Sequence, residues 1–267
     1  MPSEEAQRVP VAGDNVILQF SNILNPTLST VNYNNPLNPS LGTVHITGDT
    51  EVITLNHLQD PLLDTLFTLS TSDLWLGYGG GQNATYNLEN GILNVSGETR
   101  VGLSGIISDG GISTSGIGTF NQTDGTHTVG TNLVIASRTE LPNGTDNPTG
   151  TYNLSNGSLT VLGNTSVGHS GQGTFNQSDG TYHTNSMDVG SFGVLGTTTF
   201  TAFGNGTYNL SGGTLAVSDL TRIGRGGTGI FEQSGGTFTT GSLSIGVGGA
   251  VPGGQTGPNK GTYNLSA

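Results

Sequence analysis

The chain of 267 residues contains no cysteine. Disulfide bonds are therefore excluded, and stability must come from packing and backbone hydrogen bonding alone. Charged residues are also scarce, at 9% of the chain against about a quarter in an average protein. Eighteen acidic residues face only five arginines and one lysine, which gives a net charge of −12. This balance argues against nucleic acid and against an anionic membrane surface as partners, because both require a basic face.

The sequence also lacks long apolar runs. No segment approaches the length of a membrane-spanning helix, and no basic and then apolar leader follows Met1. Bulky and small apolar residues make up 31%, and 46 glycines are added to them. With glycine included, the apolar share is close to that of an ordinary globular protein, so an ordered fold with many small residues is expected.

What the chain has in abundance is internal repetition. Thr-Tyr-Asn-Leu occurs at 85–88, 151–154, 207–210 and 262–265, and Thr-Phe-Asn-Gln or Ile-Phe-Glu-Gln occurs between them at 119–122, 174–177 and 230–233. Repetition of this kind indicates a quasi-one-dimensional architecture in which each unit contacts only its neighbours. It also argues against an enzyme, because a repeat distributes its chemistry along the chain.

The spacing of the two motifs predicts the fold. Tyr152 and Phe175 lie 23 residues apart, and Phe175 and Tyr208 lie 33 apart, so short units of 23 residues alternate with long units of 32 or 33. Each unit contains three short strand signals bounded by Gly, Asn or Asp. We therefore expect an all-β protein, a parallel β-solenoid of about seven three-stranded rungs.

The repeats divide the chain into two parts. Residues 1–41 match no rung and are expected to form a capping or linker segment, with Val16–Phe20 as a capping strand. Residues 42–267 are expected to form the solenoid. It carries an insertion near 56–73, in which Asp60–Phe67 has the pattern of a short amphipathic helix over the first rung, and a loop insertion near 106–115.

Alternation along the strands separates inward from outward residues. The asparagines that flank the aromatic residues are expected to form an amide ladder along the stack. The aromatic residues of the repeats are expected to stack in one buried column: Tyr86, Phe120, Tyr152, Phe175, Tyr208 and Phe231.

Threonines give a second outward pattern, on the second strand of each unit. Such a flat Thr-x-Thr array resembles the ice-binding surface of antifreeze proteins, although His183 and Ala216 interrupt it. Threonine is also a common exposed strand residue without further function. The candidate face comprises Thr126, Thr128, Thr160, Thr181, Thr214, Thr237 and Thr239.

No catalytic or metal-binding constellation emerges. Glycan lyases and hydrolases on β-helical folds need acids that converge on one groove, whereas the acids here are scattered over turns and different faces. The five histidines form no ligand set, and His127 falls in an inward column. Arg100 and Arg222 hold equivalent positions, for which a solvated face is expected rather than ion pairs with neighbouring rungs. We expect no catalytic residues, no metal and no cofactor.

The repeats have a recognisable resemblance. The alternation of Gly-Thr-Tyr-Asn-Leu-Ser-Gly-Gly-Thr-Leu at 206–215 with Gly-Ile-Phe-Glu-Gln-Ser-Gly-Gly-Thr-Phe-Thr at 229–239 resembles the β-strand repeats of secreted bacterial surface proteins, both autotransporter passengers and exosortase-sorted (PEP-CTERM) proteins. The resemblance covers residues 42–267 and implies a right-handed parallel β-helix at the cell surface or outside the cell. The chain shows neither the sorting tail nor the membrane barrel of those families, so their modes of anchoring are not expected.

The last motif begins a rung that the sequence does not complete. A solenoid without a terminal cap presents unpaired backbone to other chains. The strand of Thr262, Tyr263, Asn264 and Leu265 is therefore the candidate assembly end. The sequence predicts an extracellular structural protein that polymerises with itself into a surface fibre or matrix. The alternatives are a surface adhesin that contacts glycans, an ice-binding protein and a polysaccharide lyase or hydrolase.

Overall fold

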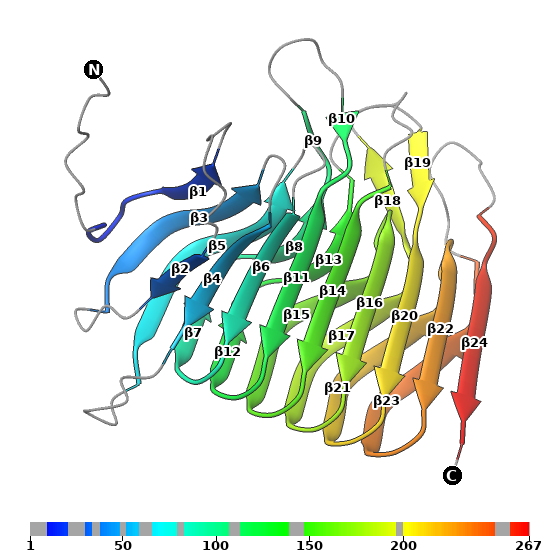
Figure 1. Cartoon of the computed structure of the whole chain (residues 1–267). Helices are drawn as coiled ribbons and strands as arrows, with labels where there is room; N and C mark the ends of the chain where they lie inside the picture. The colour runs from blue at the N-terminus through cyan, green and yellow to red at the C-terminus, as the bar shows by residue number, and fades with distance from the viewer. Residues whose placement is uncertain are drawn as a thin grey trace.

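A computed structural model describes residues 10–20, 30–33, 38–48, 52–58, 66–78, 83–106, 113–138, 147–195, 200–248 and 257–266. Every regular element in these ranges is a β-strand, and most of the strands belong to two long parallel sheets (Figure 1). The architecture is all-β and consistent with a β-solenoid. No helix long and apolar enough to cross a membrane occurs in these ranges.

The first sheet, sheet B, contains the repeated motifs. Its nine strands pair in parallel, and the order along the sheet follows the order along the chain. The strands are β2 (Thr30–Tyr33), β4 (Ile53–His57), β6 (Asn83–Leu88), β11 (Ile117–Gln122), β14 (Thr149–Leu154), β16 (Gln172–Gln177), β20 (Asn205–Leu210), β22 (Thr228–Gln233) and β24 (Lys260–Leu265).

The second sheet, sheet A, has eleven strands, several of which are long and bent. The register between neighbours shifts at the bend, for example between Val161 and Asn164, and the short strands β7 and β8 pair with the two halves of β5. The strands are β1 (Val16–Phe20), β3 (Ser40–Gly48), β5 (Thr68–Tyr78), β7 (Ile92–Val95), β8 (Thr99–Leu103), β12 (Thr126–Val129), β13 (Leu133–Ser137), β15 (Ser158–Val167), β17 (Thr181–Val189), β21 (Thr214–Ile223) and β23 (Thr237–Ile245).

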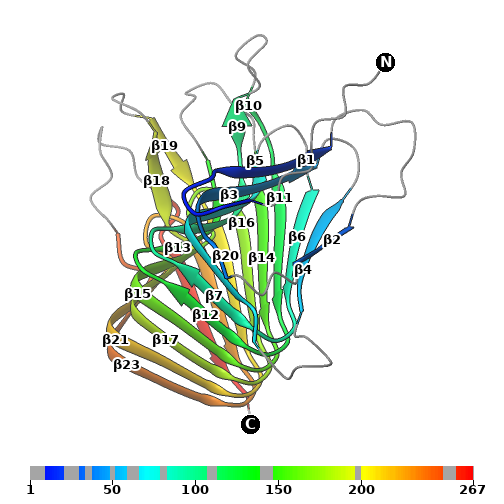
Figure 2. The same cartoon turned by 90° about the vertical axis from the view of Figure 1, so that its left-hand side faces the viewer.

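From β6 to β23, tight turns join each strand of sheet B to the next strand of sheet A, and the two sheets meet along these turns (Figure 2). Glycine is required there. Gly157 has a φ of +84°, and a Cβ at this position would lie 2.4 Å from the carbonyl oxygen of Gly125 in the neighbouring turn. The stacked turns therefore tolerate only a residue without a side chain at this point.

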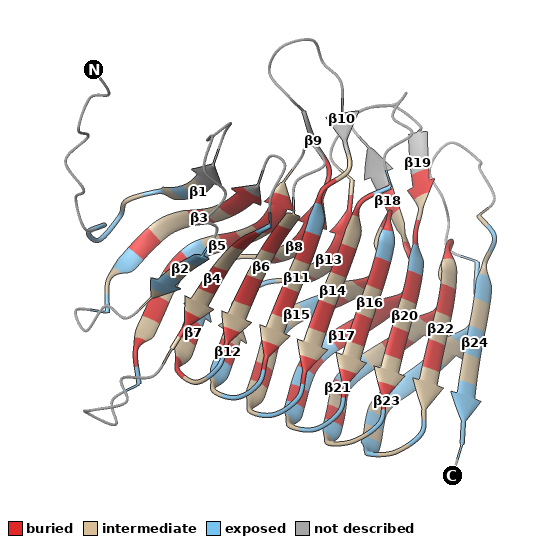
Figure 3. Cartoon of the chain, in the orientation of Figure 1, coloured by how far each residue is buried: buried red, intermediate tan, exposed pale blue. Residues whose placement is uncertain are grey.

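The core lies between the two sheets. Alternate residues along the strands are buried, which is visible as alternating red and tan bands on sheet B (Figure 3). Residues such as Leu74, Val101, Leu159 and Ile223 from sheet A meet the aromatic residues of sheet B in one continuous cluster. The burial follows from the period of two along each strand.

Two short antiparallel hairpins extend from the stack (Figure 1). Strands β9 (Gly105–Ile106) and β10 (Ser113–Thr114) form the first, at the position of the loop insertion expected near 106–115, and residues 107–112 lie outside the described residues. Strands β18 (Phe192–Leu195) and β19 (Phe200–Phe203) form the second.

The N-terminal segment continues both sheets. Strand β1 pairs in parallel with β3, and β2 pairs in parallel with β4, so the pairing pattern extends into the segment 1–41 that was expected as a cap or linker. The helix predicted over Asp60–Phe67 lies mostly outside the described residues. Within it, Leu66 and Phe67 are described and lead without helical structure into β5.

Candidate functional site

The six aromatic residues assigned to one column lie on the inner face of sheet B. Strand pairing makes each the direct neighbour of the next. All six are fully buried, and successive ring centroids lie 4.6–4.9 Å apart with interplanar angles of 5–8°. Because no part of these rings reaches solvent, the column of Tyr86, Phe120, Tyr152, Phe175, Tyr208 and Phe231 stabilises the fold and offers no surface to a ligand.

The hydroxyl of each tyrosine in the repeated Thr-Tyr-Asn-Leu motif finds its partner one strand earlier in sheet B. Tyr152 donates to Gln122 Oε1 at 2.7 Å, and Tyr208 donates to Gln177 Oε1 at 2.6 Å. Tyr263 bonds Gln233 in the same way, and Tyr86 bonds His57. A strand that precedes a Tyr strand therefore needs a polar acceptor, whereas a strand that precedes a Phe strand carries leucine at that position. This pairing gives the physical reason for the alternation of the two motifs.

Two histidines belong to this buried network. Burial lowers the pKa of His127 to about 3 and that of His57 to about 4, so both are neutral at pH 7. The Tyr152 hydroxyl already donates to Gln122, so His127 Nδ1–H donates to the Tyr152 oxygen at 3.0 Å and Nε2 accepts from Thr99 Oγ1 at 3.2 Å. Both rings fill polar positions in the core. For His127 this agrees with the inward position expected from the sequence.

Asparagine side chains form a ladder along the outer face of sheet B. Six hydrogen bonds of 2.7–2.9 Å connect them, and each Nδ2 donates to the Oδ1 of the preceding strand. The ladder stops at Glu232, whose carboxylate has no hydrogen to donate and instead accepts from Asn264 Nδ2 at 2.8 Å. The asparagine ladder comprises Asn32, Asn56, Asn87, Asn121, Asn153, Asn176 and Asn209.

The threonines of the predicted face lie on the outer side of sheet A. Thr126, Thr181, Thr214 and Thr237 share one column with Ser158. Thr128, Thr160 and Thr239 share the neighbouring column, in which His183 and Ala216 stand between Thr160 and Thr239. Neither column is an unbroken array of threonine.

Sheet B carries a longer threonine column that the sequence reasoning did not assign. Seven adjacent strands place threonine two residues before the asparagine of the ladder. The sequence could have revealed this column, because threonine is the first residue of the repeated motif. The column comprises Thr30, Thr54, Thr85, Thr119, Thr151, Thr174 and Thr207 and ends at Ile230.

The candidate assembly end is an outer strand of sheet B. Strand β24, with Thr262, Tyr263, Asn264 and Leu265, pairs only with β22, and β23 forms the corresponding edge of sheet A. Thr262 and Asn264 are exposed, and the Leu265 side chain is 70% exposed. Both sheets therefore present a free backbone edge at this end of the described chain.

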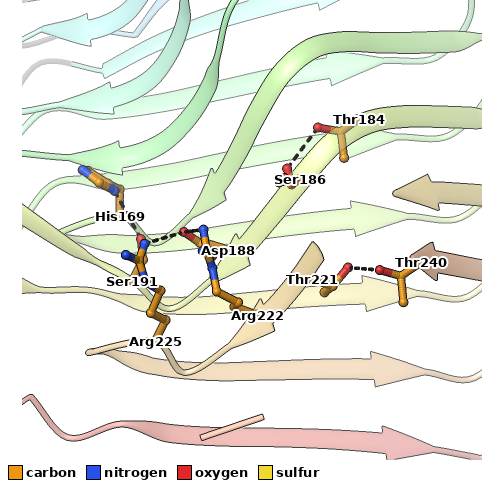
Figure 4. Close-up of polar contacts among 9 residues, drawn as sticks. All are labelled: His169, Thr184, Ser186, Asp188, Ser191, Thr221, Arg222, Arg225 and Thr240. Atoms are coloured by element: carbon orange, nitrogen blue, oxygen red, sulfur yellow. Dashed lines mark hydrogen bonds and ion pairs between the residues drawn. The ribbon is translucent and has the colours of Figure 1, made fainter. Parts of the chain in front are cut away.

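A charged cluster lies on the outer side of sheet A, near the corner that leads back to sheet B (Figure 4). Asp188 receives two hydrogen bonds from the Arg222 guanidinium and a longer contact of 3.4 Å from Arg225. Arg100 pairs with Glu98 at 2.7 Å. The expectation that Arg100 and Arg222 face solvent without pairing was wrong, because a carboxylate lies within reach of each: Glu98 just before the strand of Arg100, and Asp188 on the strand adjacent to that of Arg222.

Ser191 and His169 in this cluster superficially resemble a nucleophile and its base, with Ser191 Oγ 3.2 Å from His169 Nδ1 (Figure 4). Ser191 is only 2% exposed, so a substrate carbonyl cannot approach its oxygen. The carboxylate of Asp188 bonds arginines, which leaves the pair without the acid that orients a catalytic histidine. The contact is a structural hydrogen bond.

Trp75 lies further along the same side of sheet A. Its ring stacks on His45, with centroids 4.3 Å apart and an interplanar angle of 13°, and the Arg100 guanidinium lies 5.8 Å from its centroid. Tyr78 contacts both rings. These contacts between adjacent strands leave Trp75 half-buried as part of the packing of the outer face.

In the described part of the chain, no group of three or more His, Asp or Glu side chains is arranged to hold a metal ion. The described acids Glu89, Asp124, Asp179 and Asp219 lie on turns or on separate strands. The polar features with a regular geometry are thus the two outer columns of sheet B and the two edges of the stack.

A scan against known protein-family models and searches of curated proteins and of solved structures each found no match to this chain.

Proposed function

We propose that the protein is a non-enzymatic structural subunit that assembles end to end into an extracellular fibre or matrix. In this proposal the stack is a right-handed solenoid of about seven rungs in which short and long units alternate. The extracellular location rests on the resemblance of the repeats to those of secreted bacterial surface proteins. The observation that carries the proposal is the match between the two ends of the stack.

The two ends are open and apolar in complementary ways. At one end, Leu265, Leu243 and Ile245 are 70%, 42% and 43% exposed on the edge strands. At the other end, an apolar cavity of about 290 Å³ opens among residues such as Val16 and Tyr33 on β1 and β2. Burying both surfaces in one junction removes apolar area from water.

The columns also continue from one end to the other. If β2 of one copy pairs with β24 of another in the register used throughout sheet B, Thr30 follows Thr262 and Asn32 follows Asn264. Asn32 Nδ2 would then donate to Asn264 Oδ1, in the direction in which every amide of the ladder donates. Head-to-tail stacking therefore extends the sheet without a change in side-chain chemistry.

Two exposed leucines allow a matched test. Leu265→Lys places a charge in the proposed junction, whereas Leu162→Lys makes the same change at a leucine of β15 that is 63% exposed and away from either end. Sedimentation velocity over a concentration series should show assembly that Leu265→Lys abolishes and Leu162→Lys preserves. Electron microscopy should show filaments that lengthen with concentration. Dispersed single particles at high concentration, or equal effects of the two variants, would contradict the proposal.

The other functions receive less support from the geometry. An ice-binding or adhesive role for the outer face of sheet A must accommodate His183 and Ala216 within its columns. Normal ice growth in a thermal-hysteresis assay would dismiss the first of these roles. Hydrolase or lyase chemistry needs converging acids, and Glu89, Asp124, Asp179 and Asp219 lie on turns or on separate strands.

A further inference from the structure

The outer face of sheet B is the longest uniform surface among the described residues. On the seven strands from β2 to β20 it carries the threonine column and, beside it, the asparagine ladder. The outward positions that precede these threonines on the longer strands are also uncharged: Asn83, Ile117, Thr149, Gln172 and Asn205. We call the threonine column and the asparagine ladder together the Thr–Asn face.

This neutrality is notable because the chain carries a net charge of −12. Glu89 lies at the rim of the face, and Glu232 lies on the next strand beyond it. Two copies of so acidic a protein repel each other in most orientations. The Thr–Asn face itself carries no charged side chain, so two copies can approach through it with few like charges in contact.

The side chains of the face are held in place before any partner arrives. Each amide inside the ladder uses one N–H and one oxygen lone pair to bond its neighbours along the sheet, at 2.7–2.8 Å for Asn121, Asn153 and Asn176. A primary amide has two N–H groups and two lone pairs, so one of each remains for an external partner. Fixed side chains lose little entropy on binding.

The repeat of the face determines which partner fits it. Strands in a sheet lie about 4.8 Å apart, so the face offers a hydroxyl and an amide at that interval. A second Thr–Asn face has the same interval and therefore meets each donor and acceptor in register, as identical ladders do in stacked sheets. A ligand pocket would instead gather a few convergent polar groups among apolar walls.

The surface has the shape and size for such a contact. An open groove of about 540 Å³ follows the asparagines and leaves room for side chains of a facing sheet. It is bounded by Glu89, Thr123, Ser155 and Ser178. Seven strands at about 4.8 Å and six residues at about 3.3 Å give a face of roughly 34 by 20 Å. This is somewhat less than the roughly 800 Å² that each partner buries in a standard interface.

We propose that two copies of the chain pair laterally through their Thr–Asn faces. The contact is isologous, since the same face is used on both copies. It is separate from the end-to-end junction, because it lies on the side of the stack. Its strength grows with the length of an assembled rod, since each added copy extends the paired face.

Small-angle X-ray scattering combined with sedimentation equilibrium distinguishes the two contacts. Lateral pairing increases the cross-sectional radius of the particles, whereas end-to-end assembly increases only their length. The full chain should show a cross-section that grows with protein concentration, and should do so also in the Leu265→Lys background. A cross-section that stays constant over the series would overturn lateral pairing and leave the end-to-end proposal unaffected.

Two threonines provide the matched variants. Thr151→Lys places a charge on the Thr–Asn face, and Thr181→Lys places the same charge on the outer side of sheet A. Both reduce the net negative charge, so nonspecific association should strengthen in both. Specific pairing predicts at least a tenfold rise in the dimer dissociation constant for Thr151→Lys and no rise for Thr181→Lys. Equal responses, or a dimer with Thr151→Lys as strong as that of the unchanged chain, would overturn the assignment of this face.

Discussion

On the outer faces of the two sheets, side chains of adjacent strands stack on one another in different ways. On sheet B, seven strands repeat the same threonine and asparagine, and each amide bonds an identical neighbour. On sheet A, one outer column runs through residues as different as Trp75, Arg100, Asp188 and Arg222. There Arg100 lies over the ring of Trp75, and Asp188 bonds Arg222, so neighbours differ in chemistry.

The comparison shows what a repeated column requires of its side chains. Asparagine can repeat without limit because it is both donor and acceptor. A charged residue cannot, because the next identical residue would repel it. The column of sheet A therefore places charged residues apart or beside a partner of opposite charge, as Asp188 lies beside Arg222, whereas the ladder of sheet B remains neutral until Glu232 ends it.

The inner sides of the two sheets differ less, because buried polar groups connect them. Lowering the pH is expected to have the largest effect on the stability of the protein, through the buried histidines. The unfolded chain protonates its histidines near pH 6.5, while folded His127 and His57 protonate only near pH 3 and 4. Between these values the unfolded state binds more protons, so stability falls as the pH falls, by about 1.4 kcal/mol per pH unit for each histidine. Denaturation at a series of pH values measures this slope.

His127→Leu isolates one contribution. The neighbours in its column, Leu93 and Leu159, show that leucine fits the position. The variant should lose about 1.4 kcal/mol per pH unit of the slope between pH 6 and pH 4. An unchanged slope would mean that His127 is not neutral and buried in the folded protein.

The mixed chemistry of sheet A makes Asp188 the next most sensitive position. Asp188→Asn removes the charge that holds Arg222 and Arg225, and its side chain is only 12% exposed. We expect a loss of about 1–3 kcal/mol in unfolding free energy, because both guanidiniums lose their counter-charge. Asp219→Asn changes the net charge equally at an exposed position and should shift stability by less than about 0.5 kcal/mol. Similar losses in both variants would mean that the ion pairs contribute nothing specific.

The uniformity of sheet B predicts a smaller effect. Asn153→Asp replaces an amide of the ladder with a carboxylate that cannot donate to Asn121. At pH 7 the variant should lose about 1 kcal/mol, and the loss should shrink below about pH 4, where the new acid is protonated and can donate. Asn156→Asp, in an exposed turn, is the control and should show neither effect. Urea denaturation at pH 7 and pH 3.5 supplies the comparison, and a pH-independent loss would argue against the ladder as its cause.

Much of this arrangement could be predicted from the sequence because the repeats align themselves. Once Tyr152 and Phe175 are recognised as equivalent, alternation assigns the residues around them to the inside or the outside. The aromatic column, the amide ladder and the inward position of His127 follow from that step alone. The uniform parts of the molecule could therefore be predicted from the sequence.

The parts of the molecule that do not repeat could not be predicted in this way. The ion pair between Asp188 and Arg222 depends on which residues of adjacent strands become neighbours. The repeated motifs do not predict this pairing, because neither residue belongs to them. Strand β2 was missed because Thr30 and Asn32 repeat the motif without its aromatic residue. The threonine column of sheet B was overlooked because its residues were assigned only as flanks of the aromatic column.

The pairing of tyrosine with an acceptor one strand earlier has a consequence for how such a chain can change in length. Removing a unit with phenylalanine and glutamine would place a tyrosine above leucine, with its hydroxyl buried and unbonded. Removing a unit with tyrosine and leucine would instead leave a glutamine oxygen beneath phenylalanine. Removing two consecutive units restores both contacts. The stack therefore obeys a parity rule, and the smallest unit that can be duplicated or lost without penalty is a pair, with one member that carries the hydroxyl and one that receives it.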